Sequence, residues 1–168
     1  MSAFGSCEET RRKMRYPTRR TRVMPRPRGA YSMPTPEAEV LAANQAFYDA
    51  FCQHDIAAME AVWSQRVDLA CVHPGWEAIH GRRDVLSSWR AILSSPEAPE
   101  VQCSDAVAHM VGDVAYVVCN ELLPGAELSA TNVFVREAGT WKLVHHHAGP
   151  VASRVEEPRS RPTPKVLN

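Results

Sequence analysis

The chain has 168 residues with 19 basic and 19 acidic side chains, so its formal net charge is zero. This length fits one domain with enough residues to bury a sizeable core. The charges are unevenly placed, because residues 34–153 carry only 6 basic but 15 acidic side chains, which argues against nucleic-acid binding by this part. No apolar run approaches the ~20 residues that a membrane helix needs, so we expect no membrane partner.

The cysteines and the absence of an apolar secretory signal favour a reducing compartment. Five cysteines are present, an odd number, and none are spaced as Cys-x-x-Cys. We therefore expect a cytoplasmic protein whose cysteines are small core residues. Cys71 and Cys119 lie in predicted strands without an electropositive setting, so we do not expect them to act as nucleophiles.

Both ends of the chain are predicted to be disordered: residues 1–34, an Arg- and Pro-rich leader, and residues 152–168, a tail. The leader has few aliphatic residues and nine basic side chains among its first 33 residues. Three functional interpretations stay open, namely an organellar transit peptide, a basic arm for nucleic acid or anionic lipid, and a mis-called start. The abrupt change in composition at Pro34 favours the third, with translation beginning at Met33 or Met24.

Three helices are predicted in the first half of a domain that spans residues 35–151. The first is marked by Thr35 as a cap, Pro36 in the first turn and apolar residues at helical spacing. Asp55 can cap the second helix, and Gly81 precedes the third. We expect these helices over residues 36–53, 56–63 and 82–93.

Strands are predicted mainly in the second half. Alternating or β-branched segments bounded by turn residues indicate strands over residues 67–73, 101–110, 114–123, 130–137 and 140–148, with a short extended piece over 76–80. Helices followed by an antiparallel meander predict an α+β fold, with the helices packed on one face of the sheet.

The last two strands are predicted to form a hairpin around Ala138-Gly139. A two-residue turn places Asn132 opposite His145 and Ala130 opposite His147. The face so formed is apolar near the turn and polar at its far end, which suggests the floor of a pocket. Its members are Asn132, Phe134, Trp141, Leu143, His145 and His147.

These segments together resemble the nuclear transport factor 2-like superfamily, and within it the SnoaL-like proteins. The resemblance covers Thr35 to Val151 and rests on four segments: Glu39–Gln53 followed by His54-Asp55, VDLACVHPGWEAIHG, Val85–Leu93 with Ser88-Trp89, and GTWKLVHHHAGP. It implies a cone-shaped fold, with three N-terminal helices on a curved antiparallel sheet that wraps around a pocket. It also implies a homodimer formed through the outer face of the sheet. The superfamily includes isomerases, cyclases and dehydratases as well as non-catalytic modules, so the fold alone does not decide the activity.

The ketosteroid isomerases of this superfamily have known catalytic residues, whose positions can be matched to this sequence. Their mechanism uses an acidic base, a helix tyrosine and a protonated aspartate. The position of the tyrosine falls on Phe47, which has no hydroxyl, while Tyr48 is expected ~100° around the helix. The base falls at His73 and the aspartate falls on Asn132. With these exchanges, the sequence does not predict steroid isomerisation by that mechanism.

The candidate catalytic residues are therefore His73, Asn132 and His145. His73 or His145 would act as a general base, and Asn132 would donate a hydrogen bond to a developing oxyanion. The alternative is that these side chains only line a cavity and satisfy one another. Candidate ligand contacts are Phe47, Trp76, Phe134 and His147. 

A metal site is one interpretation of these histidines, because His145 and His147 alternate on one strand and His73 could be a third ligand. No acidic residue on that strand would complete the shell, so we expect no metal and no cofactor. Two function classes remain. The first is a small-molecule enzyme, an acid–base isomerase, cyclase or dehydratase for an apolar cyclic or polyketide-like substrate. The second is a non-catalytic ligand-binding or dimerisation module.

Overall fold

The computed structural model describes residues 33–66 and 68–151. The predicted disorder of the leader and of the tail falls outside these residues, as does the predicted strand start at Val67.

All three predicted helices are present and end within one residue of their expected bounds: α2 (Pro36–Cys52), α3 (Ile56–Val62) and α4 (Arg82–Leu93). The caps explain where two of them begin. The Thr35 side chain accepts a hydrogen bond from the Ala38 amide at 3.2 Å, and Asp55 accepts one from Ala58 at 2.9 Å. None of the helices in the described part of the chain is long and apolar enough to cross a membrane.

Six strands form one sheet: β1 (Ala70–Val72), β2 (Ile79–His80), β3 (Gln102–Val111), β4 (Val114–Leu123), β5 (Ala126–Glu137) and β6 (Thr140–Pro150). Their order is β2-β1-β6-β5-β4-β3. The predicted curved antiparallel sheet is confirmed with one departure, since β1 runs parallel to β6. The long strands β3 to β6 form the antiparallel meander expected from the sequence.

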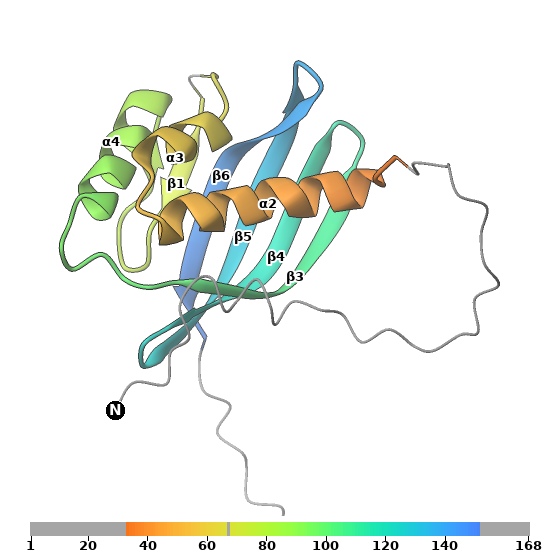
Figure 1. The fold of residues 1–168 in the computed structure, drawn as a ribbon. Helices are drawn as coiled ribbons and strands as arrows, with labels where there is room; N and C mark the ends of the chain where they lie inside the picture. Colours follow the sequence, from red (N-terminus) through yellow and green to blue (C-terminus); the bar gives the residue numbers. More distant parts are fainter. Residues whose placement is uncertain (1–32, 67, 152–168) are drawn as a thin grey trace, which may run out of the picture.

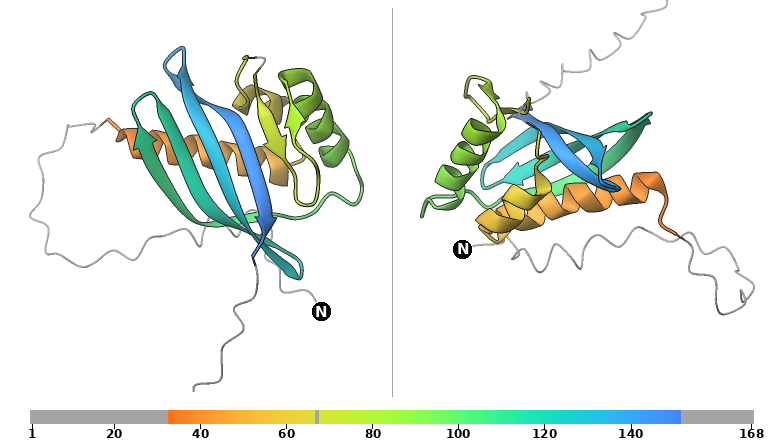
Figure 2. Two further views of the ribbon diagram at one scale, coloured as in Figure 1. Left: turned by 180° about the vertical axis from the view of Figure 1, so that it is seen from behind. Right: turned by 90° about the horizontal axis from the view of Figure 1, so that it is seen from above.

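The helices cover only one face of the sheet. In Figure 1, α2 crosses in front of β6, β5, β4 and β3, while α3 and α4 lie at the end where β1 joins the sheet. The core fills the space between them and the inner face, with Phe47 of α2, Trp63 after α3 and Phe134 of β5 fully or almost fully buried. Figure 2 shows the opposite, outer face, over which no helix of the described residues lies.

Strand β6 contains a β-bulge that the sequence did not predict. Leu143 pairs with Phe134 and His145 pairs with Val133, so Val144 is one residue too many on the β6 side. The predicted register holds from the Ala138-Gly139 turn as far as Leu143.

Beyond the bulge the predicted register is wrong by one residue. Asn132 pairs with His146 instead of His145, and Ala130 pairs with Ala148 instead of His147. Because side chains alternate along a strand, this one-residue shift exchanges the two faces. His146 is therefore buried on the inner face, while His147 is exposed.

Substitution of Leu143 tests the assignment of the two faces. Its side chain is fully buried next to the bulge. We expect Leu143→Ala to lower the free energy of unfolding by about 2–5 kcal/mol, because a buried side chain is replaced by a cavity. Val118→Ala on the outer face, where the side chain is 37% exposed, should cost less than about 1 kcal/mol. Urea unfolding followed by circular dichroism measures both, and equal losses would contradict the assignment.

Candidate functional site

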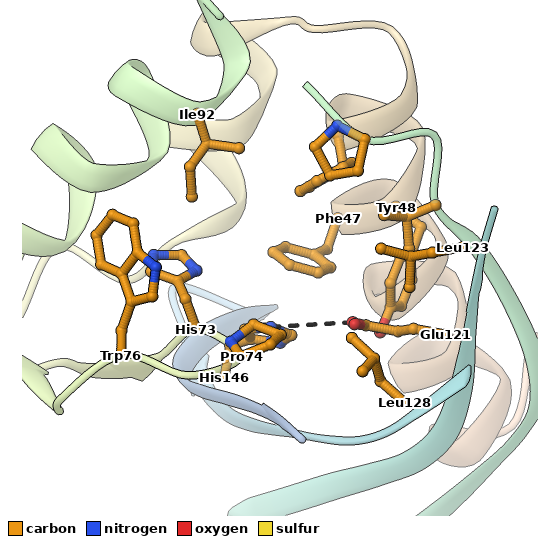
Figure 3. Close-up of a pocket in the computed structure, with 13 residues that line it drawn as sticks. Phe47, Tyr48, His73, Pro74, Trp76, Ile92, Glu121, Leu123, Leu128 and His146 are labelled. Carbon is orange, nitrogen blue, oxygen red and sulfur yellow. Dashed lines mark hydrogen bonds and ion pairs between the residues drawn. The ribbon is translucent and has the colours of Figure 1, made fainter. Parts of the chain in front are cut away.

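A cavity of about 180 Å³ lies between α2, the turn after β1, the start of β3 and the inner face of the sheet (Figure 3). Most of its lining is apolar or aromatic, and four titratable side chains interrupt it. The lining residues are Phe47, Tyr48, Phe51, His73, Pro74, Trp76, Ile92, Pro99, Val101, Glu121, Leu123, Leu128 and His146.

Glu121 is a carboxyl group in this largely apolar setting. Alternation along β4 places it on the inner face with Ala115, Val117 and Cys119, and its side chain is only 5% exposed. Burial raises the pKa of Glu121, and a hydrogen bond from the Tyr48 hydroxyl to Oε1, at 2.8 Å, opposes this in part.

Tyr48 lies on the wide buried face of α2 together with Val40, Asn44 and Phe51. Burial raises the pKa of its hydroxyl, and the charge of Glu121 adds to the effect. Tyr48 therefore keeps its proton and acts as a hydrogen-bond donor to Glu121. Its oxygen also lies 3.2 Å from the Cys119 sulfur.

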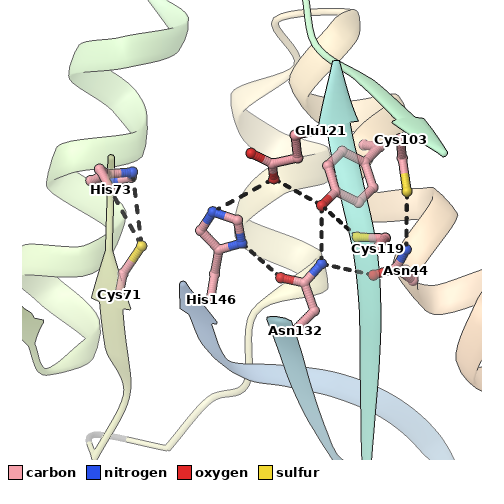
Figure 4. Close-up of polar contacts among 9 residues, drawn as sticks. Asn44, Cys71, His73, Cys103, Cys119, Glu121, Asn132 and His146 are labelled. Atoms are coloured by element: carbon pink, nitrogen blue, oxygen red, sulfur yellow. Dashed lines mark hydrogen bonds and ion pairs between the residues drawn. The ribbon is translucent and has the colours of Figure 1, made fainter. Parts of the chain in front are cut away.

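Asn132 links α2 to the last strand through its side-chain amide (Figure 4). Its side chain is 0% exposed, and Nδ2 donates to Asn44 Oδ1 at 2.7 Å and to the Tyr48 oxygen at 3.4 Å. On the other side, Asn132 Oδ1 lies 2.7 Å from His146 Nδ1. Asn44 Nδ2 in turn points to the Cys103 sulfur at 3.7 Å. Each amide in this chain of contacts has partners, as buried polar groups require.

His146 is 2% exposed and lies 5.1 Å from the ring of Phe47 and 5.7 Å from that of Trp89, measured between ring centroids. Its Nε2 is 3.9 Å from Glu121 Oε1, which is longer than a hydrogen bond. Burial lowers the pKa of His146 to about 3, with a smaller contribution from His73 and the neighbouring histidines. The ring is therefore neutral near pH 7.

His73 faces the cavity from the turn after β1 and is 4% exposed. Its Nε2 is 2.9 Å from the Ser88 hydroxyl, and its ring lies edge-to-face against Trp76 and Trp89. Burial lowers the pKa of His73 to about 4. The adjacent Cys71 thiol has a pKa raised to about 12, mainly by burial, which agrees with a core residue and not with a nucleophile.

The structure brings together some of the residues that the sequence singled out. His73, Phe47 and Trp76 line the cavity, and Asn132 is bonded to a residue that lines it. Phe134 is fully buried on the same face and is not part of the lining.

His145 and His147 lie elsewhere because of the bulge. His145 is half-buried with Nδ1 3.1 Å from the Ala70 carbonyl oxygen, and His147 is exposed. The three imidazoles considered for a metal, those of His73, His145 and His147, therefore do not converge. In residues 33–66 and 68–151, no group of three His, Cys, Asp or Glu side chains is placed to hold a metal ion.

Three residues of the site were missed by the sequence reasoning. Alternation along β4 would have placed Glu121 on the inner face with Cys119. Phe47 has no hydroxyl, but the buried face of α2 is wide enough to bring its neighbour Tyr48 to the cavity as well. No pattern in the sequence marked the bulge that turns His146 inward.

The buried neutral histidines predict acid lability. Below pH ~6.5 the imidazole of an unfolded chain binds a proton, whereas folded His73 does not do so until about pH 4. Stability should therefore fall as the pH is lowered through this window, by up to about 3 kcal/mol for this group. His73→Gln should reduce the loss, and His80→Gln, which changes an exposed imidazole, is the matched control. Urea unfolding at a series of pH values measures it; an unchanged pH dependence in His73→Gln would contradict the burial of a neutral ring.

Comparisons with known proteins agree with this fold. A protein from Streptomyces avermitilis, of the NTF2-like family and named for a proposed dehydratase activity, is 34% identical, with a TM-score of 0.62 over 68% of this chain and 95% of that one. A protein from Thiobacillus denitrificans, named for a proposed calcium/calmodulin-dependent protein kinase type II association domain, is also 34% identical, with a TM-score of 0.62 over 71% of this chain and 97% of that one.

A curated relative and a family match complete the comparison. The F-box protein SKIP8 of Arabidopsis thaliana is 25% identical over 111 residues, which are 65% of this chain and 48% of that protein. The chain thus spans about half the length of this curated relative. The SnoaL-like domain matches residues 40–153, well over half of the chain. The chain belongs to the SnoaL-like domain family, within the NTF2-like fold.

Proposed function

We propose that this chain binds a small, largely apolar cyclic molecule in the cavity and moves protons on it by acid–base chemistry, as an isomerase, cyclase or dehydratase does. The observation that carries this proposal is a buried carboxyl group, Glu121, on the wall of an otherwise mostly apolar cavity. A carboxyl group whose pKa is raised by burial is suited to proton transfer near neutral pH.

The volume of the cavity suits a substrate with one ring. Cavities of about 150 Å³ hold a molecule the size of benzene, and this one has about 180 Å³. Phe47, Phe51 and Trp76 offer aromatic surfaces to such a ring. Glu121 on one side and His73 on another offer polar groups for an oxygen substituent, and Tyr48 and Asn132 stand behind Glu121 as supporting residues. The name of the S. avermitilis relative, a proposed dehydratase, is in line with this chemistry.

Proton exchange on simple ketones tests the proposal. A panel of one-ring cyclic ketones and hydroxyketones is incubated with the protein in D₂O, and deuterium uptake next to the carbonyl is followed by mass spectrometry. Thermal shift of the protein reports binding in parallel. We expect Glu121→Gln to retain binding, because the amide keeps the shape of the carboxyl group, and to slow exchange by about 10²–10⁴-fold.

The matched control is Glu127→Gln, the same change at an exposed position of β5. It should exchange deuterium at the wild-type rate. Equal exchange by wild type and Glu121→Gln would show that this carboxyl group does not transfer the proton.

The second candidate function is self-association through the outer face of the sheet. Cross-strand pairs of β3 and β4 expose apolar side chains there: Val107 opposite Val118, and Val111 opposite Val114. Between these pairs the rings of His109 and Tyr116 stack, with centroids 4.7 Å apart. Such a face fits a second copy of this chain, and the T. denitrificans relative is named for an association domain.

Solution mass tests this interface. We expect the wild type to sediment as a dimer and Val118→Lys to shift it toward the monomer, because a buried ammonium group in the interface would be unpaired. Ala91→Lys adds the same charge at an exposed position of α4 and should leave the dimer intact. A monomeric wild type at micromolar concentration would exclude the interface.

A further inference from the structure

The hydrogen bonds around Asn132 determine which atom of its amide faces His146. The single hydroxyl proton of Tyr48 is donated to Glu121, so the Tyr48 oxygen can only accept from Asn132 Nδ2. The same amino group donates to Asn44 Oδ1. The Asn132 oxygen is thus left to face His146 Nδ1 at 2.7 Å. An amide oxygen has no proton to give, so Nδ1 must carry one.

From this geometry we propose that Asn132 holds neutral His146 in the tautomer with the proton on Nδ1, so that Nε2 presents its electron pair to the cavity as the proton acceptor of the reaction. Asn132 is then a positioning residue, and His146 takes the role of general base that the sequence predicts for His73 or His145. This inference deepens the proposed function and rests on it.

The matching proton donor is Glu121. Its Oε1 lies 3.9 Å from His146 Nε2, too far for the two groups to bond directly. A short ion pair would be expected if the histidine were protonated and the carboxylate ionised. Burial acts in the opposite direction on the two groups, raising the pKa of the acid and lowering that of the base. When the pKa values of two neighbouring groups are moved apart, one group can act as the acid and the other as the base.

The step can be written for a ketone whose ring occupies the cavity. The C–H bond next to the carbonyl breaks, its proton forms an N–H bond at His146 Nε2, and its electron pair becomes the C=C bond of the enol. The O–H bond of Glu121 breaks at the same time, and that proton goes to the carbonyl oxygen. The imidazolium and carboxylate so formed return to their starting states when a proton is given back to carbon and the enol proton returns to Glu121. Return to a different carbon is an isomerisation.

The groups around the imidazole come from several elements. Glu121 belongs to β4 and Tyr48 to α2, while His73 follows β1. On its own strand, His145 and His147 flank it and lower its pKa further, although their side chains lie on the opposite side of the bulged strand. Burial lowers the pKa of the ring most and His73 comes next, while Glu121, whose Oε1 lies 3.9 Å from Nε2, is the acidic side chain that faces it.

The tautomer of His146 can be observed without any substrate. Full-length protein with ¹⁵N-labelled histidine is studied by long-range ¹H–¹⁵N correlation spectra between pH 8 and pH 5, and His146→Gln identifies the signals of this residue. We expect a protonated-type shift for Nδ1 and an unprotonated-type shift for Nε2 throughout. A proton on Nε2, or a doubly protonated ring at pH 7, would overturn the inference.

Two variants of Asn132 separate positioning from packing. Asn132→Asp keeps an acceptor next to Nδ1, so the tautomer should persist, and the added negative charge should let the ring bind its second proton at a higher pH than in the wild type. Asn132→Leu removes the acceptor and should give a mixture of tautomers. If Asn132→Leu does not fold, the wild type and Asn132→Asp decide: loss of the Nδ1-protonated tautomer in Asn132→Asp would overturn the role of the acceptor.

The deuterium-exchange assay distinguishes this inference from the function on which it rests. Loss of exchange in His146→Gln with binding retained supports both. Exchange that persists in His146→Gln but is lost in Glu121→Gln overturns the role of His146 and leaves the proposed function standing. The expected tautomer without exchange on any ketone of the panel would count against both the catalysis and the role of Nε2 as its base.

Discussion

The site depends on one extra residue in β6. Without the bulge at Val144, alternation would turn His145 and His147 toward the helices and His146 toward the outer face. The strand is held in its bulged register from both sides: Leu143 accepts a hydrogen bond from the Ser64 amide at 2.9 Å, and beyond the bulge β1 pairs with His145, His146 and His147. The bulge thus selects which of three consecutive histidines meets Asn132, Glu121 and the cavity.

A second constraint is that the polar groups of the site are buried, which favours the neutral form of each titratable side chain. Each makes contacts that replace water, so the cost of desolvating an amide or a hydroxyl is largely recovered. Charged forms are penalised, which keeps a proton on Glu121 and off His146 more readily than in water. Any charge created by proton transfer in this cavity is poorly screened. Interactions between that charge and a bound molecule are therefore stronger than they would be in water.

The sequence predicted the fold well because its signals are local. Thr35, Asp55 and the Ala138-Gly139 turn mark where elements begin and end, and β4 has the predicted bounds of Val114 and Leu123. The site was predicted in part, through His73, Asn132 and Phe47, because a strand end and a helix face can be located by counting. His146 could not be found in this way, since a bulge depends on pairing with both neighbouring strands and not on the residues of β6 alone.

The parallel pairing of β1 with β6 also affects how the domain folds, because it joins two segments that are far apart in the sequence. His145 contacts the Ala70 carbonyl across 75 residues of sequence, so this edge of the sheet depends on pairing between distant parts of the chain. Bringing together residues so far apart in the sequence costs loop-closure entropy, which slows folding. During synthesis, α2, α3 and β1 leave the ribosome long before β6. Their apolar faces stay exposed until β6 has been made. A chaperone that shields these faces should therefore matter more for this chain than for one whose sheet is built only from neighbouring hairpins.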